Sequence, residues 1–123
     1  MVFIRIKVKG YLKNITENEI LEFEEKGIKN KNKITFSSDD VKTSVKIDDE
    51  DVILVRDGDD FVNTFVFNKS NSSCNYFLKE DNYDVDIDVK TNVIDISDNI
   101  VYIKYMVIDS NCEYEYKLEM SDI

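Results

Sequence analysis

The chain lacks residue types on which much enzyme chemistry depends: among its 123 residues there is no histidine, no proline and only three glycines. Without histidine there is no imidazole base, no Ser-His-Asp or Cys-His pair, and no zinc site of the usual nitrogen and sulfur kind. The three glycines do not form a loop that cradles phosphate. We therefore predict a protein that is not an enzyme, with no catalytic residue, no cofactor and no metal.

Carboxylates are the remaining route to catalysis, since 26 residues are Asp or Glu. Carboxylate pairs can hydrolyse glycosidic bonds, but catalytic acids generally lie in clefts with apolar neighbours, whereas these acids fall in turns or on polar strand faces. Asp84, Asp86 and Asp88 superficially match a calcium loop, yet Val89 and Asp95 stand where such a loop needs Gly and Glu. The outer face of a strand explains them better, and a hydrolase is our weakest hypothesis.

The net charge of −10 at pH 7 disfavours two classes of partner. A fold of this charge repels phosphate backbones at long range, and no basic stripe offsets the repulsion. We expect no binding to nucleic acid or to anionic membranes. The apolar share of 42%, with seven Tyr and seven Phe, argues against disorder. The length predicts one domain, residues 1–123.

The N-terminal residues already alternate between apolar and polar, so we predict no signal peptide. No segment reaches the length of a membrane span, because Lys104 interrupts the best apolar stretch, residues 100–108. A cytoplasmic location is the expectation that follows. Cys74 and Cys112 are in phase with apolar residues, which favours free, buried thiols in a reducing compartment. A disulfide between them is the alternative if their strands are neighbours.

A two-residue alternation of apolar and polar side chains runs along the chain, most clearly in residues 2–8, 83–89 and 112–120. Successive side chains of a strand point to opposite faces, so this pattern gives one buried and one solvated face. The protein is therefore predicted to be all-β. We place the strands near residues 2–12, 20–29, 33–37, 41–48, 51–57, 61–68, 74–79, 83–91, 93–97, 99–109 and 112–120.

The connections between these segments are short, and Asp, Asn and Ser replace proline in them. Short connections imply antiparallel neighbours. Residues 16–19 have the form of a helix capping box, but no apolar partner follows Phe23 one turn later, so a strand is favoured there too. Regular short turns favour a sheet that closes into a barrel over a two-sheet sandwich, because a sandwich usually has long crossover connections. We predict a single antiparallel up-and-down barrel of about eight to ten strands.

The chain also resembles a known family along nearly its whole length. The resemblance is carried by short segments: 22–23 with Gly27, 34–36, 52–58, 65–67, Tyr76, 85–91 and 103–105. They resemble the YwiB-like proteins, a bacterial family of unknown function found mostly in Gram-positive organisms. The resemblance implies a calycin-like, or lipocalin-like, antiparallel barrel and no particular activity. Residues 81–82, Asp-Asn, depart from the family, which usually has a Gly in that hairpin.

Arg56 is the strongest single candidate for a binding residue. It ends the most apolar segment, in phase with Val52 and Leu54. If that phase faces the barrel interior, the guanidinium needs a pairing partner or binds an anion. If the alternate residues face inward instead, Arg56 lies at the rim, paired with Asp57 or Asp59. Both interpretations stay open at this point.

Tyrosine hydroxyls are further candidates, because a ligand inside the barrel needs hydrogen-bond partners. The candidate binding set is Arg56, Tyr76, Tyr105 and Tyr116. Aromatic side chains more often fill a core, and an eight-stranded barrel has room only for its own side chains or one small ligand. The crowded inward faces therefore predict little free space.

Two hypotheses about function follow. The first is a non-enzymatic binding protein that takes a small apolar or anionic molecule into the barrel near Arg56. The second is an interaction or structural module with a filled barrel, which works through outward apolar residues such as Phe3, Tyr102 and Met106, for example as a homodimer. The size of the interior separates them.

Overall fold

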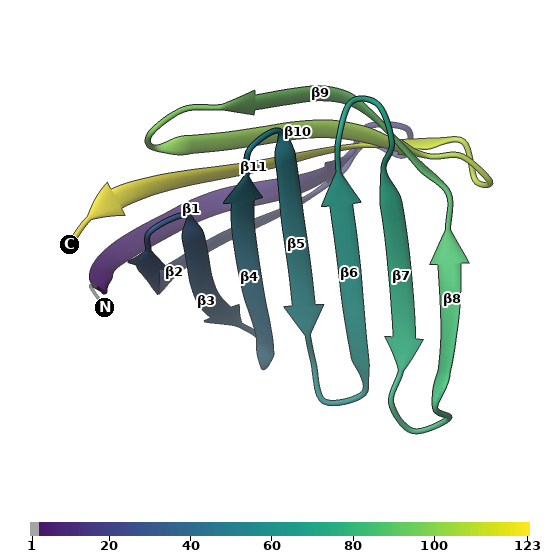
Figure 1. Ribbon diagram of the computed structural model, residues 1–123, viewed down its shortest axis with the longest axis horizontal. Coiled ribbons are helices and arrows are strands. Elements are labelled where there is room, and N and C mark those ends of the chain that lie inside the picture. Colours follow the sequence, from purple (N-terminus) through teal and green to yellow (C-terminus); the bar gives the residue numbers. More distant parts are fainter. Residues whose placement is uncertain (1–2) are drawn as a thin grey trace.

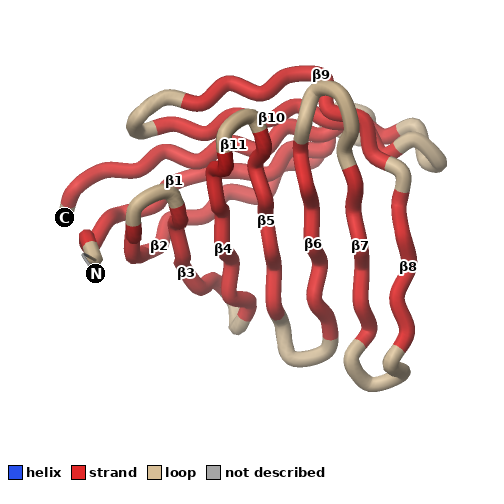
Figure 2. Tube along the Cα trace, viewed as in Figure 1, coloured by secondary structure: helices blue, strands red, loops and turns tan. Residues whose placement is uncertain are grey.

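The structure is a computed structural model that describes residues 3–123. In this range the chain forms eleven β-strands (Figure 1) and no helix, as the strand colour throughout Figure 2 shows. The strands are β1 (Ile4–Asn14), β2 (Glu19–Asn30), β3 (Lys33–Ser38), β4 (Val41–Asp48), β5 (Asp51–Asp57), β6 (Phe61–Phe67), β7 (Ser73–Leu78), β8 (Tyr83–Ile87), β9 (Val89–Ile96), β10 (Ile100–Val107) and β11 (Cys112–Asp122).

All eleven strands belong to one sheet in the order β8-β7-β6-β5-β4-β3-β2-β1-β11-β10-β9. Neighbours are antiparallel, and except for β1 and β11 they are also consecutive in sequence. The sheet curls, so that β1 and β11 run behind β4–β7 in Figure 1. The predicted all-β, antiparallel up-and-down barrel is confirmed. It has eleven strands rather than eight to ten, because every strand-forming segment joins the same sheet.

The two edges of the sheet, β8 and β9, are consecutive in sequence, and the chain passes from one to the other at Asp88. Two contacts stabilise this corner: the Ile108 N–H donates to the Asp88 carbonyl over 2.9 Å, and the hydroxyls of Ser72 and Thr91 lie 2.6 Å apart. The strand break predicted near residue 92 is therefore at Asp88, and Asn92 forms a β-bulge opposite β10. The bend turns β9 away from the direction of β8 and toward β6 and β7 (Figure 1), which nearly closes the barrel.

The alternation in the sequence becomes a division between core and surface. Fully buried side chains come from both halves of the sheet: Val8, Ile34, Val45, Val52, Phe67, Val101, Ile103 and Leu118. Tyr83 and Val85 share the inward phase but are 60% and 40% exposed, because β8 is an edge strand with only β7 beside it. Val2, the first residue of the predicted inward set, lies outside the described residues.

The strand interpretation of β2 is confirmed, since β2 pairs with β1 from Glu19 to Lys29. Its other side is only partly paired. β3 pairs with β2 over four residue pairs, from Gly27 with Phe36 to Asn30 with Lys33. Residues 19–26 therefore have no strand partner on the β3 side within the described chain, and the barrel wall is open there.

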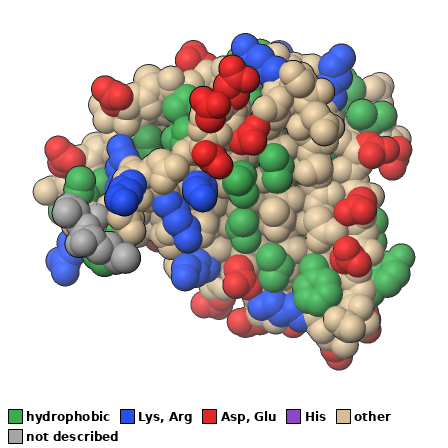
Figure 3. Space-filling model, viewed as in Figure 1, with side chains coloured by type: hydrophobic (Ala, Val, Ile, Leu, Met, Phe, Trp, Pro, Cys, Tyr) green, Lys and Arg blue, Asp and Glu red, His purple; other side chains and the backbone are tan. Residues whose placement is uncertain are grey.

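The outer face is charged, as the alternation predicts. Figure 3 shows acidic side chains predominating beside β7 and β8, on the right of the view. Asp84 and Asp86 are exposed on β8, and the Asn75 amide donates to both carboxylates over 2.9 Å. The outer-face interpretation of these two acids is confirmed. Across residues 3–123, no group of His, Cys, Asp and Glu side chains is arranged to hold a metal ion, and no helix is long and apolar enough to cross a membrane.

Candidate ligand-binding cavity

A row of polar side chains crosses the inner face of the sheet. Thr43 of β4, Arg56 of β5 and Asn63 of β6 are directly paired neighbours, so their side chains lie next to one another. The next inward row toward the core is entirely apolar on these strands: Val45, Leu54 and Phe65. The polar row therefore marks the boundary between the packed core and the open end of the barrel.

A cavity of about 310 Å³ lies against this row, inside the barrel. Its lining is mostly apolar and aromatic, and among the described residues Arg56 is its one positively charged side chain. The cavity opens where residues 21–23 of β2 face Ser38 and Asp39 across the unpaired edge of β2. The predicted lack of free space is wrong for this end of the barrel, because the pairing of β2 with β3 stops at Gly27 and Phe36 and leaves the wall open beyond it.

Arg56 faces the interior, in the same phase as the buried residues Val52 and Leu54. The rim alternative is wrong, because Val52 and Leu54 are the buried residues of β5 and Ile53 and Val55 are not. Asp57 instead forms an ion pair with Lys79 at 2.8 Å. Within residues 3–123 no carboxylate lies at ion-pair distance from Arg56. A guanidinium has five N–H donors, and a cation beside apolar walls costs free energy when it has no partner. An anion in the cavity would remove that cost.

Two tyrosine hydroxyls share the cavity with Arg56. Tyr105 and Tyr116 are only 5% and 7% exposed, and neither hydroxyl has a hydrogen-bond partner in the described part of the chain. Burial raises the pKa of both well above 10.0, and the nearby charge of Arg56 offsets part of the rise. Both hydroxyls therefore stay protonated at neutral pH and can each donate one hydrogen bond. Three of the four predicted binding residues are thus brought together from β5, β10 and β11.

Phe23 forms one aromatic wall of the cavity. Its ring stacks on Phe36 with the centroids 5.5 Å apart, and its centroid lies 6.3 Å from that of Tyr116. Gly10 of β1 is the pairing partner of Phe23, and a Cβ at Gly10 would lie 2.8 Å from Phe23 Cζ. The missing side chain therefore lets the ring lie close to the backbone of β1.

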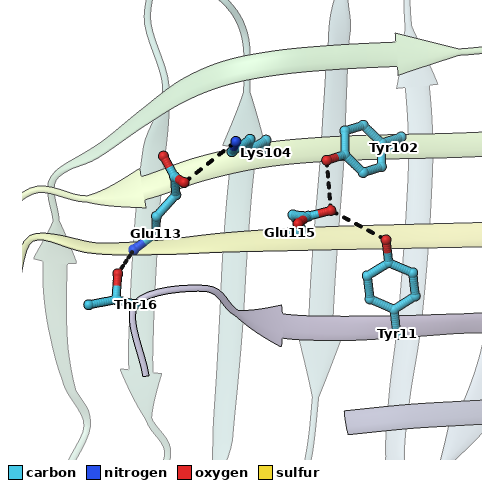
Figure 4. Close-up of polar contacts among 6 residues, drawn as sticks. All are labelled: Tyr11, Thr16, Tyr102, Lys104, Glu113 and Glu115. Carbon is cyan, nitrogen blue, oxygen red and sulfur yellow. Dashed lines mark hydrogen bonds and ion pairs between the residues drawn. The ribbon is translucent and has the colours of Figure 1, made fainter. Parts of the chain in front are cut away.

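The fourth predicted residue, Tyr76, does not line the cavity. It pairs with Asn63 on the inner face, but its ring stacks on Phe61 with the centroids 5.5 Å apart. Tyr102 faces outward, where its hydroxyl donates to Glu115 Oε2 over 2.7 Å (Figure 4). Tyr102 does not face the cavity because alternate residues of a strand point to opposite faces. On β10 the inward residues are Val101, Ile103 and Tyr105.

Both cysteines are free thiols. Cys74 is buried on β7, where its thiol donates to Asn63 Oδ1 over 3.3 Å and burial raises its pKa to about 11. Cys112 begins β11, which is not a neighbour of β7 in the sheet. The disulfide that the sequence left open is therefore not formed.

Sequence reasoning missed five polar residues of the lining: Thr43, Asn63, Glu22, Ser38 and Asp39. Thr43 and Asn63 could have been found from the sequence. The turns of the β4–β5 and β5–β6 hairpins set the register, and that register pairs both residues with Arg56. Glu22, Ser38 and Asp39 could not have been found in this way, since they border an opening that depends on where the pairing of β2 with β3 stops.

The fold and the cavity define an antiparallel up-and-down barrel with an internal pocket. This structure is similar to the crystal structure of the ywiB protein from Bacillus subtilis, with a TM-score of 0.70 and 19% sequence identity over 98% of this chain and 92% of that one. No family model matches the chain, and no curated protein matches it in sequence. The barrel expected from the resemblance to YwiB-like proteins is confirmed, and at this identity the likeness shows the fold alone.

The buried tyrosines predict a loss of stability at alkaline pH. Burial and Glu115 raise the pKa of Tyr102 to about 12, and burial raises the pKa of Tyr105 above 10.0 as well. Unfolded tyrosines ionise near pH 10.0, so the unfolded chain loses these protons first, and the free energy of unfolding falls as the pH rises from 10 toward 12. Urea unfolding midpoints across this range measure the fall. Tyr105→Phe should make it shallower, and a constant midpoint up to pH 12 would contradict the expectation.

Proposed function

We propose that this protein is a non-enzymatic binding protein that holds a small molecule with an apolar body and an acidic group in the barrel cavity. The observation that supports it is the guanidinium of Arg56, which has no partner among residues 3–123 and shares an apolar cavity with the hydroxyls of the buried residues Tyr105 and Tyr116. Ligand pockets typically combine apolar walls with a few placed polar groups, in volumes of about 300–1,000 Å³. A cavity of about 310 Å³ suits a small ligand.

A carboxylate suits the donors at the inner end of the cavity. The planar fork of Arg56 matches the two oxygens of a carboxylate, and such charge-assisted hydrogen bonds are stronger than neutral ones. The hydroxyls of Tyr105 and Tyr116 supply two more donors for the remaining lone pairs. The apolar body would lose contact with water against Phe23 and Phe36. The alternative, a filled barrel that works through its outer surface, is less well supported because this barrel is not filled.

Calorimetric titration with octanoate and octanol tests the proposal. The two probes share an apolar chain and differ in the head group. We expect octanoate to bind with a Kd on the order of 10–100 μM. Octanol should bind about tenfold more weakly or worse, because its neutral hydroxyl forms no ion pair with Arg56 and cannot accept two parallel hydrogen bonds from the guanidinium. Absence of octanoate binding at millimolar concentration would contradict the proposal.

A further inference from the structure

The mouth of the cavity is acidic, whereas its inner end is basic. Asp39 of the β3–β4 turn lines the opening, and Arg56 lies inside. Glu22 of β2 borders the opening from the outward-facing side of its strand, where it pairs with Tyr11. A groove that shares Ser38 and Asp39 with the cavity adjoins the opening. Its charged residues are five carboxylates and one ammonium: Glu25, Asp39, Asp40, Lys42, Asp57 and Asp59. A ligand that passes this mouth therefore meets negative charge outside and positive charge inside.

The two ends of the cavity fix the direction in which a ligand lies. The donors of Arg56, Tyr105 and Tyr116, which have no partner in the described part of the chain, are at the inner end, and the two tyrosines are more than nine-tenths buried. An acidic group placed there leaves the other end of the ligand near Glu22 and Asp39. Because both rim carboxylates are close to water, their effect is moderate and depends on salt, but its sign is fixed.

We propose that the cavity selects its ligand by the charge at the ligand's outer end, accepting a positively charged group there and rejecting a second negative one. The preferred class is therefore a zwitterionic amphiphile with a carboxylate at one end, an apolar chain in the middle and an ammonium at the other end. This inference rests on the proposed function, since it assumes that the acidic group binds at Arg56. Glu22 and Asp39 are the residues that determine the specificity.

Two probes isolate the sign of the outer charge. ω-Aminooctanoate and octanedioate both have eight carbons and the same inner carboxylate, and they differ at the eighth carbon, which carries an ammonium in the former and is itself a second carboxylate in the latter. In calorimetric titrations at low salt and neutral pH, we expect ω-aminooctanoate to bind about tenfold more tightly than octanedioate. The ratio should approach one at 1 M salt, where the Debye length is about 3 Å.

The double variant Glu22→Gln with Asp39→Asn tests the assignment to the rim. Asn tolerates the positive φ of 52° at position 39, so the turn should be retained. We expect the preference for ω-aminooctanoate to shrink several-fold in this variant. The control is Asp48→Asn with Glu50→Gln, which removes the same two charges from exposed positions in and beside the β4–β5 turn, away from the cavity lining. The control should keep the preference.

Octanoate separates failure of this inference from failure of the proposed function. If octanoate binds but octanedioate binds as tightly as ω-aminooctanoate, the charge selection is overturned and the binding function stands. If the preference persists unchanged in the rim variant, Glu22 and Asp39 are not its source, and the inference is overturned as well. If octanoate itself does not bind, the proposed function fails, and this inference fails with it.

Discussion

Replacing Phe67 with alanine is expected to lower the free energy of unfolding by about 3–5 kcal/mol. Phe67 is fully buried on β6, and its ring centroid lies 5.0 Å from that of Phe65 and 5.0 Å from that of Tyr105. Tyr105 belongs to β10, which forms no sheet pairing with β6. Phe67 therefore packs across the barrel against a strand that is not a hydrogen-bonded neighbour of its own, and the void left by its ring can be only partly refilled.

Phe3→Ala is the matched control, because it removes the same atoms from a side chain that is 60% exposed. We expect a change within about 0.5 kcal/mol for this variant. Denaturant unfolding of both variants measures the difference. Since Phe67 does not line the cavity, its loss should act on stability first and on ligand affinity second. Equal destabilisation by the two variants would contradict the central position of Phe67 in the core.

Arg56→Leu is expected to separate binding from stability. Truncating one partner of a buried charged hydrogen bond typically costs about 2–5 kcal/mol of binding free energy, so the affinity for octanoate should fall by about 100-fold. The stability of the ligand-free protein should stay the same or rise by about 1 kcal/mol, because a half-buried cation without a partner is replaced by an apolar side chain of suitable size. Calorimetric titration and denaturant unfolding of the same preparation measure both effects.

Lys46→Leu is the control for Arg56→Leu, since it removes one positive charge from the exposed face of the neighbouring strand β4. It should leave octanoate binding unchanged. Arg56→Lys should bind octanoate with intermediate affinity, because an ammonium keeps the charge but loses the planar fork. If Arg56→Leu reduced stability and left octanoate binding intact, Arg56 would be a structural residue and the proposed function would lose its main support.

The strands were largely predictable because a period of two is a local property of the chain. In β11, Tyr116, Leu118 and Met120 are buried as the pattern predicts. The same pattern fails for Tyr83, which has the inward phase but is exposed on the edge strand β8. Parity determines which face a side chain is on, whereas burial also requires another wall opposite that face.

The candidate site was predictable in part. The phase of Arg56 with Val52 pointed to the interior once a buried β5 was assumed, and the structure places it there. Tyr105 and Tyr116 were predicted because an inward tyrosine hydroxyl can form a hydrogen bond with a ligand. Tyr76 shares that property, but it lies away from the cavity and packs on Phe61. Position along the barrel axis is set by register between strands, which no single strand specifies.

The sequence by itself determined the strands, their antiparallel order and the division of side chains between a buried and a solvated face, because these follow from local alternation and short turns. Only the tertiary structure decided that the wall opens beside β2, and that Arg56, Tyr105 and Tyr116 meet inside it. The physical reason is that the cavity depends on where one ladder of hydrogen bonds stops and on how far the sheet curls. Both are properties of the whole barrel, set by packing among residues far apart in the chain.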